Sequence, residues 1–513
     1  MLSIVHACAV IGIDGVPVEV QVDFNPRAGV PSFSIVGLPS ASVRESRERV
    51  RSAIKNSKLQ FPNKGYVVNL APADLPKHSS AYDLAIAVGV LASTDQIPLA
   101  ALDNALFIGE LYLNGQVEHV KGVMSMALAA REAGKTTLYV PAVNAAEAAL
   151  IPDVEVVPLE SVGALVEHLY GLNTIAPYVP PPDALDTHID GLPDGITNFA
   201  DVKGQEHVKR ALEIAAAGNH NVIMTGSPGV GKSLLARAMP GILPRLTIEE
   251  ALEVTRIHSV ADALHGSQPL IRARPFRAPH HTISQAGLVG GGTVPKPGEI
   301  SMAHRGVLFM DEIVEFAPRT LEVLRQPVED KTVTISRAKG TVTFPANFLL
   351  VAARNPCPCG YHGDPTRACT CTPSAITRYA SRLSGPMLDR IDIHVDVPRV
   401  EYDKLMKAER GESSLAVRAR VERARELQYA RFADHPGLFA NADMGAGEIQ
   451  QLCVLADDAK QLLELSVRRM ALSARSYHRV LKLSRTIADL AESEIIQVNH
   501  VAEAIQYRPK DQT

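Results

Sequence analysis

The chain has 513 residues, of which 46% are hydrophobic and 21% charged, the composition of an ordinary globular protein with about three folding units. Its formal net charge of −4 excludes a polycation that coats nucleic acid or an anionic membrane, although it leaves room for a local basic surface. The start MLSIVHACAVIGIDG lacks a basic segment, and the longest apolar run, LAIAVGVLA, is far too short to span a membrane. We therefore expect a cytoplasmic protein without a membrane partner, in which structural disulfides are rare.

Residues 1–172 predict alternating strands and helices. VPVEVQVDF alternates apolar with polar side chains, as in a half-buried strand, and a helix is expected after Ser40. The dipeptide Asn114-Gly115 predicts a hairpin whose tight turn uses positive φ angles. Residues 173–197 contain a run rich in Pro, Gly and Asp, which predicts a linker.

A second unit, residues 198–400, contains the segment GSPGVGKS, which fits the phosphate-loop pattern GxxxxGK[ST]. An apolar strand precedes this segment and a helix follows it, so the N-terminus of the helix would point at the phosphates of ATP. Lys232 is expected to reach the β- and γ-phosphates, and Ser233 to bind Mg²⁺. The predicted nucleotide-binding residues are Gly226, Ser227, Pro228, Gly229, Val230, Gly231, Lys232 and Ser233.

Two further strands of this unit end in polar residues. GVLFMDE ends in Asp311, which is placed to hold Mg²⁺ through water, and Glu312, which is placed to activate the attacking water. NFLLVAARN ends in Asn355, a group suited to sense the γ-phosphate or the attacking water. Between these strands, KTVTISRAKGTVTFP predicts a hairpin with a cationic tip at Arg337 and Lys339, suited to contact DNA phosphates.

Four of the six cysteines lie directly after the predicted strand NFLLVAARN, in NPCPCGYHGDPTRACTC. The pairs Cys357/Cys359 and Cys369/Cys371 offer four thiolates to one tetrahedral ion, so a structural Zn²⁺ is predicted. CxC pairs are less diagnostic of zinc than CxxC pairs, so reduced buried thiols and a redox switch stay open as alternatives. His362 is an alternative ligand or a surface histidine of the loop.

Residues 401–513 predict a helical unit, because apolar residues recur there at spacings of three and four. This unit contains Arg475 and Arg479, and the segment before it contains Arg390. An arginine at the edge of a subunit can neutralise charge that develops on the nucleotide of a neighbour.

The segments NFADVKGQ, GSPGVGKS, AHRGVLFMDE, VAARNP, LSGPMLDRIDIHV and SARSYHRVLKLSRTIADL together resemble the magnesium-chelatase-like branch of the AAA+ ATPases, and within it the bacterial YifB/ComM family. Residues 275–301 resemble the insert that this family carries before the acidic strand. The resemblance implies an α/β protein with an αβα P-loop core, a C-terminal α-helical lid, and a homo-oligomeric ring, commonly a hexamer, with ATP between neighbours. It also implies that Asn355 is sensor 1, Arg390 the trans-acting arginine finger and Arg475 the lid arginine, with Arg479 as an alternative.

The N-terminal segments PADLPKHSSAYDLAIAVGVLA and AREAGKTTLYVP resemble the proteolytic domain of Lon, which shares the fold of ribosomal protein S5 domain 2. Lon-type cleavage uses a serine and a lysine, and Ser79 and Ser80 lie near the place of the serine. The alignment puts Met124 at the place of the lysine, and a thioether cannot accept the serine proton. Lys121 lies three residues away, on a different face of a helix. We therefore expect a proteolytically inactive scaffold or docking module.

Three functions follow from the resemblance. The first is an ATP-driven motor on single-stranded and branched DNA, a branch-migration helicase of homologous recombination and natural transformation. The second is a protein unfoldase or Lon-like ATP-dependent protease, but LVG in the insert lacks the aromatic residue of an unfoldase pore loop. The third is a magnesium-chelatase-type remodelling ATPase. The DNA motor is preferred because of the family resemblance and the predicted cationic hairpin.

Overall fold

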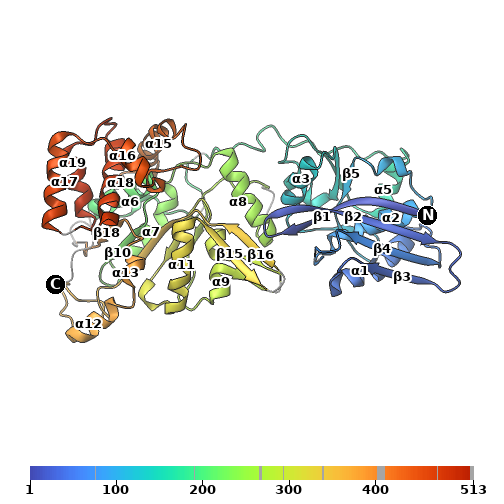
Figure 1. Cartoon of the computed structure of the whole chain (residues 1–513), viewed down its shortest axis with the longest axis horizontal. Helices are drawn as coiled ribbons and strands as arrows, with labels where there is room; N and C mark the ends of the chain where they lie inside the picture. Colours follow the sequence, from blue (N-terminus) through green and yellow to red (C-terminus); the bar gives the residue numbers. More distant parts are fainter. Residues whose placement is uncertain are drawn as a thin grey trace.

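The structure, a computed structural model, describes residues 1–75, 77–189, 191–193, 195–264, 269–292, 294–337, 340–400, 411–470 and 472–508. Figure 1 shows an elongated molecule with an N-terminal α/β part at one end, a second α/β part in the middle and a helical C-terminal part at the other end. Among the described residues, no helix combines the length and the apolar character needed to cross a membrane.

The N-terminal part is built on a mixed sheet with the strand order β3-β4-β2-β1-β5-β8-β9. Val18, Val20 and Val22 of its second strand are fully buried, so the predicted half-buried strand is confirmed. LAIAVGVLA forms a helix that is buried along its whole length, because it is apolar on every side. The strands are β1 (Leu2–Ile11), β2 (Asp14–Asn25), β3 (Ser32–Val36), β4 (Gly65–Ala71), β5 (Ala105–Phe107), β8 (Thr137–Pro141) and β9 (Glu155–Leu159). The helices are α1 (Ala41–Asn56), α2 (Asp83–Ser93), α3 (Val123–Glu132), α4 (Ala145–Ala148) and α5 (Val162–Leu169).

A hairpin forms at the predicted place, between β6 (Glu110–Leu111) and β7 (Val117–Glu118), but its turn differs from the expectation. Of the two expected turn residues, Gly115 has a positive φ of 91°, whereas Asn114 does not. The strands stop early and leave a longer connection. The Asn114 side chain closes it by accepting a hydrogen bond from the amide of Gln116 at 3.0 Å.

The middle part contains a parallel sheet with the strand order β11-β14-β17-β10-β18. Strands buried between two layers of helices need nearly continuous apolar runs, and VIMT, VLFM and LLVAAR supply them. The strands are β10 (Val222–Thr225), β11 (Phe276–Arg277), β14 (Val307–Met310), β17 (Leu349–Arg354) and β18 (Ile393–Asp396). The helices are α6 (Glu206–Gly218), α7 (Lys232–Ala238), α8 (Ile248–Ala261), α9 (Gln285–Val289), α10 (Glu299–Met302), α11 (Pro318–Asp330), α12 (Pro373–Ala380) and α13 (Gly385–Leu388).

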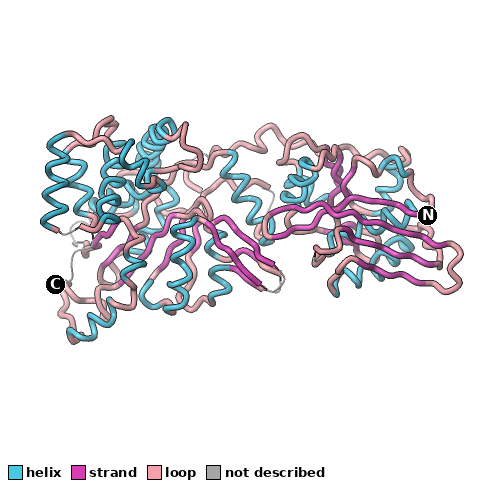
Figure 2. Tube along the Cα trace, viewed as in Figure 1, coloured by secondary structure: helices cyan, strands magenta, loops and turns pink. Residues whose placement is uncertain are grey.

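Two small hairpins extend from this part toward the N-terminal part. The predicted cationic hairpin is formed by β15 (Thr332–Arg337) and β16 (Gly340–Pro345), drawn in magenta beside the N-terminal sheet in Figure 2. The shorter hairpin consists of β12 (Gly290–Gly291) and β13 (Lys296–Pro297). The longer hairpin touches the β1–β2 turn, because a Cβ atom at Gly12 would lie 2.6 Å from Cγ1 of Val342.

Helices α3 and α8 also join the N-terminal and middle parts (Figure 1). Glu147 beside α3 accepts a hydrogen bond from the Ser259 hydroxyl of α8, and Lys121 forms a 2.6 Å ion pair with Asp262. Burial raises the pKa of Glu147, although its hydrogen bonds oppose this shift. The two parts are thus held together by polar contacts as well as by apolar packing.

The C-terminal part is helical, as predicted, and shares one hydrophobic core with the parallel sheet and α6. Val480, Leu483 and Ile487 are buried on one face of its central helix, and Leu490 is partly buried. The helices are α15 (Ser414–Arg431), α16 (Ala446–Leu452), α17 (Asp457–Arg469), α18 (Ala474–Leu490) and α19 (Val498–Gln506).

Candidate functional site

The segment GSPGVGKS joins the end of β10 to the start of α7, in the strand–loop–helix context that the sequence predicts. Gly229 and Gly231 have φ angles of 78° and 95°, in the region that favours glycine, so the backbone can curl around an anion. The amide of Gly226 donates to the Arg354 carbonyl of β17 at 3.2 Å and fixes the start of the loop.

Lys232 lies inside the loop that it is expected to serve. Its ammonium group donates to the carbonyls of Gly226 and Ser227 at 2.6 and 3.0 Å, and to Oδ1 of Asn355 at 3.0 Å. Burial lowers the pKa of Lys232, and the charges of Asp311 and Glu312 oppose this shift. The cation is therefore held at the centre of the site, next to the group predicted to sense the nucleotide.

The oxygens expected to hold Mg²⁺ lie together. The Ser233 hydroxyl donates to Oδ2 of Asp311 at 2.7 Å, so the first turn of α7 meets the end of β14. Hydroxyl and carboxylate oxygens are the ligands that Mg²⁺ prefers, so these residues fit the ion. Glu312 follows with φ 48°, a strained conformation for a glutamate, and strain of this kind clusters at functional sites.

Arg390 and Arg475 lie at the opposite edge of the parallel sheet. β10 and β18 run parallel, and the phosphate loop follows the end of β10 whereas Arg390 precedes the start of β18. The two edges are therefore roughly 10 Å or more apart. Arg390 and Arg475 both bind the carboxylate of Glu329, the latter at 2.5 Å, beside a cavity of about 1160 Å³.

Arg479, the alternative lid arginine, has a different environment. Its side chain is 7% exposed, and it donates to the Asp389 carbonyl at 2.5 Å and lies 3.6 Å from Oδ1 of Asp392. It joins α18 to the segment before β18.

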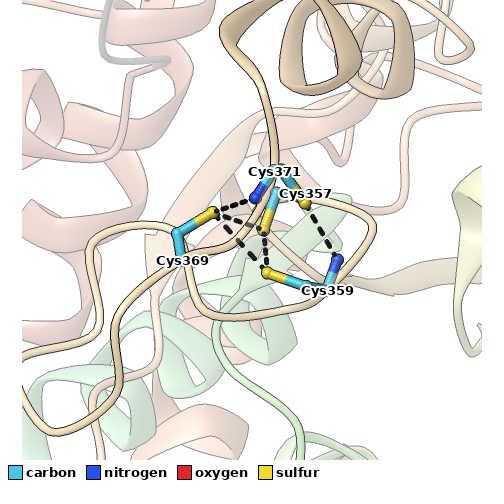
Figure 3. A group of neighbouring side chains, drawn as sticks. All are labelled: Cys357, Cys359, Cys369 and Cys371. Atoms are coloured by element: carbon cyan, nitrogen blue, oxygen red, sulfur yellow. Dashed lines mark hydrogen bonds between the residues drawn. The ribbon is translucent and has the colours of Figure 1, made fainter.

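The sulfur atoms of the four loop cysteines lie within 4.8 Å of one another; those of Cys357, Cys359 and Cys369 meet, and that of Cys371 lies beside them and accepts from the Cys359 amide (Figure 3). Sγ of Cys357 is 3.4 Å from that of Cys359 and 3.7 Å from that of Cys369. Four sulfurs about 2.3 Å from a zinc ion would be separated by about 3.8 Å. The amides of Cys359, His362 and Cys371 also donate to these sulfurs, as amides around metal-bound thiolates do. The arrangement therefore fits a tetrahedral ion, and His362 contributes its backbone amide.

The cationic tip of the longer hairpin is described in part. Arg337 is exposed at the end of β15, and Lys339 falls outside the described residues. Arg337 lies against the shorter hairpin, with its guanidinium 3.4 Å from the position of a Cβ at Gly291. Arg337, Lys296 and Lys121 line one cavity of about 650 Å³ between the N-terminal and middle parts.

Ser79 and Ser80 of the Lon-like segment border the same cavity. The Ser80 hydroxyl donates to the Glu110 carboxylate, and the Ser79 hydroxyl accepts from the amide of Ala81 at 3.1 Å. Met124 is 1% exposed, and Lys121 is engaged by Asp262. The structure thus directs Lys121 to the interface between the two parts.

Three residues near the phosphate loop were missed in the sequence. Gln205 donates from Nε2 to the Val230 carbonyl at 3.1 Å and to the Pro398 carbonyl at 2.7 Å, so it ties the loop to the chain after β18. Gly360 of the cysteine loop packs against Pro228 of the phosphate loop, and Thr366 and the Ser227 side chain lower the pKa of the Asp364 carboxyl. The turn sequence GDPT signals a capped turn at Asp364, but contacts across the fold carry no local signal.

The parallel sheet with a phosphate loop after β10, acidic residues after β14 and a helical C-terminal part defines a magnesium-chelatase-type AAA+ protein. Family models described as "Magnesium chelatase, subunit ChlI", "Subunit ChlI of Mg-chelatase" and "Magnesium chelatase, subunit ChlI C-terminal" match residues 198–405, 18–144 and 411–508. The chain is 42% identical over 518 residues to "Competence protein ComM" of Haemophilus influenzae, covering 99% of this chain and 97% of that protein.

Another relative is "Uncharacterized protein YifB" of Salmonella typhimurium, 42% identical over 516 residues, with 99% of this chain and 97% of that protein covered. The chain therefore belongs to the YifB/ComM family of magnesium-chelatase-like AAA+ proteins. A shorter match joins it to "Lon protease 2" of Bacillus subtilis, 32% identical over 160 residues, or 28% of this chain and 27% of that protein.

Proposed function

We propose that this protein is an ATP-driven ring motor that acts on DNA in competence, most specifically as a branch-migration helicase in recombination during natural transformation. The observation that carries the proposal is the 42% identity, over almost the full length of both chains, to a protein named for competence. The convergence of Lys232, Ser233 and Asp311 at the phosphate loop supports the use of ATP.

Each residue of the site has a part in the proposed hydrolysis of ATP. The backbone amides of the phosphate loop and Lys232 bind the phosphates, and Ser233 and Asp311 hold Mg²⁺, which when bound neutralises phosphate charge. Glu312 orients the attacking water and takes its proton. Asn355 leaves Lys232 and contacts the γ-phosphate or this water.

A ring, commonly of six copies in this family, completes the site. Arg390 and the phosphate loop of its own chain lie at opposite edges of the sheet, which supports an action of Arg390 on a neighbouring subunit. Arg390 therefore contacts the nucleotide of a neighbouring subunit, and Arg475, which shares Glu329 with it, enters the same interface. Contact with the neighbour's γ-phosphate would replace the bonds to Glu329.

The four loop cysteines hold one structural Zn²⁺ in this proposal. All four ligands come from the protein, so the ion has a full tetrahedral set and no open position for catalysis. The DNA contacts are made by Arg337 and Lys339 at the tip of the longer hairpin.

A second candidate, a protein unfoldase, is favoured by the match to Lon protease 2. Two observations argue against proteolysis by the N-terminal part: Met124 carries a thioether, which cannot accept a serine proton, and Lys121 is engaged in an ion pair with Asp262. A remodelling ATPase of the chelatase type rests on the family descriptions alone.

The experiment that tests the proposal compares ATP hydrolysis by the purified full chain with no addition, with single-stranded DNA, with a four-way DNA junction and with an unfolded protein. Glu312→Gln serves as the blank, because it keeps the phosphate loop but removes the general base. Stimulation by DNA with movement of the junction is expected. Stimulation by unfolded protein without a response to DNA would establish the unfoldase instead.

A further inference from the structure

The cysteine loop packs directly on the phosphate loop. A Cβ atom at Gly360 would lie 2.5 Å from Cδ and 2.6 Å from Cγ of Pro228. Carbon atoms in contact prefer separations of about 3.5–4.0 Å, so the two loops meet without room for one methyl group. Gly360 has φ 85°, and its amide donates to the carbonyl of Cys357 at 2.9 Å. The residue that touches the phosphate loop is therefore part of the turn that carries the first two cysteines.

A second contact is polar. Interactions with Thr366 and with the side chain of Ser227, which lies in the phosphate loop, lower the pKa of the Asp364 carboxyl. The same carboxylate is oriented by the amide and hydroxyl of Thr366, at 2.8 and 2.7 Å. The Arg399 guanidinium also donates to the Thr366 hydroxyl at 2.9 Å, which ties this turn to the chain after β18.

The loop has little apolar packing of its own to hold this position. Within residues 356–371, Cys357 and Gly360 are buried, and the remaining residues are exposed or half-buried. Residues without a core need another source of order, and four convergent sulfurs can supply it through a metal ion. The backbone from Cys357 to Cys371 would then be fixed at four points.

We propose that Zn²⁺ bound by the four cysteines holds this loop against Pro228, so that zinc occupancy sets the affinity of the phosphate loop for nucleotide. This inference rests on the zinc site and the nucleotide site proposed above. The backbone amides of the phosphate loop must converge on phosphate oxygens at about 2.9 Å. A displacement of the phosphate loop by about 1 Å therefore weakens several hydrogen bonds together. Zinc acts here through the position of the backbone and touches no phosphate.

The first test changes the contact and keeps every cysteine. Gly360→Ala forces a methyl against Pro228, and we expect the dissociation constant for a fluorescent ATP analogue to rise about tenfold or more, the cost of one good charge-assisted hydrogen bond. Gly363→Ala is the matched control, because Gly363 has a similar φ of 78° but has nothing within 4 Å of its Cβ position. Equal affinities of the two variants for the ATP analogue, with zinc retained in both, would show that the contact between Gly360 and Pro228 does not set nucleotide affinity.

The second test removes the metal. Cys369→Ser combined with Cys371→Ser should lose zinc by elemental analysis and bind the ATP analogue as weakly as Gly360→Ala. Absence of zinc from the wild-type chain would reject the metal site, and wild-type nucleotide affinity in the zinc-free variant would reject the coupling. A wild-type chain that fails to bind the ATP analogue at all would instead reject the proposed nucleotide site.

Discussion

At the scale of single residues, charged neighbours in the middle part shift the pKa of an acidic side chain and so make stability depend on pH. Oε2 of Glu253 on α8 accepts hydrogen bonds from Arg305 at 2.9 Å and from His304 at 3.2 Å. Burial alone would raise the pKa of Glu253, but these two partners lower it to about 2. An acid whose pKa is lower in the folded state stabilises the fold above its ordinary pKa, and this stability is lost as the pH falls.

We predict that Glu253→Gln removes this part of the acid dependence. Its contribution is complete above pH 4.5 and disappears as the pH falls toward 2, so the variant should lose about 1 kcal/mol at pH 7 and less at pH 3.5. This loss of unfolding free energy is far smaller than the full pKa shift of Glu253 would give, because the carboxylate is 46% exposed and screened by water. Urea unfolding at the two pH values measures it, with the exposed Glu249→Gln on the same helix as the control. A loss of equal size at both pH values would contradict the prediction.

At the scale of elements, the sequence predicts local structure better than contacts between distant segments. The apolar runs VIMT and VLFM predict buried parallel strands. Polar residues directly after such strands gather at one sheet edge, so the position of Asp311 near the phosphate loop was predictable. Glu329 between two arginines, by contrast, joins α11, the segment after α13, and α18, which are far apart in the chain. The expected turn at Asn114 was wrong in detail because an asparagine side chain closed a longer connection.

At this scale, we predict that the longer hairpin binds DNA through its cationic tip. Arg337→Ala with Lys339→Ala should weaken DNA binding for all sequences and make its salt dependence shallower by about two counterion-release contacts for each engaged subunit. ATP hydrolysis without DNA should persist, because the nucleotide site lies elsewhere. Titrations of labelled single-stranded DNA at several salt concentrations measure this.

The matched control is Arg468→Ala with Arg469→Ala, which removes the same charge from exposed positions on α17. Equal losses of affinity in the two double variants would mean that net charge, and not the hairpin, attracts the DNA. Wild-type affinity in the hairpin variant would assign the DNA contact to other residues.

At the scale of the whole molecule, the proposed nucleotide site would be divided between subunits. The phosphate loop lies at one edge of the parallel sheet, and Arg390 and Arg475 lie at the other beside a large cavity. In a ring of identical chains, each subunit presents one edge to each neighbour, so every interface can combine a pocket with an arginine pair.

We therefore predict complementation between two inactive variants. Lys232→Ala should fail to bind ATP tightly, and Arg390→Ala should bind ATP but hydrolyse it about 10³-fold more slowly. Mixed rings of the two should regain part of the wild-type rate, because some interfaces then join an intact pocket to an intact arginine. Hydrolysis is measured as the mixing ratio varies, and rings shown to contain both variants that recover nothing would place Arg390 in the site of its own chain.

The close approach of Gly12 to Val342 gives the assembly a mechanical property. A hairpin that moved alone would collide with the β1–β2 turn, where even a methyl group has no room. The N-terminal part also contacts Ser259 of α8 and Asp262 directly after this helix, so we expect the N-terminal part to move together with the hairpin. In the proposed ring, we expect the hairpin and the N-terminal part of each subunit to move as one rigid unit when ATP is hydrolysed. Because the hairpin cannot move alone, the displacement should have the same size in every subunit.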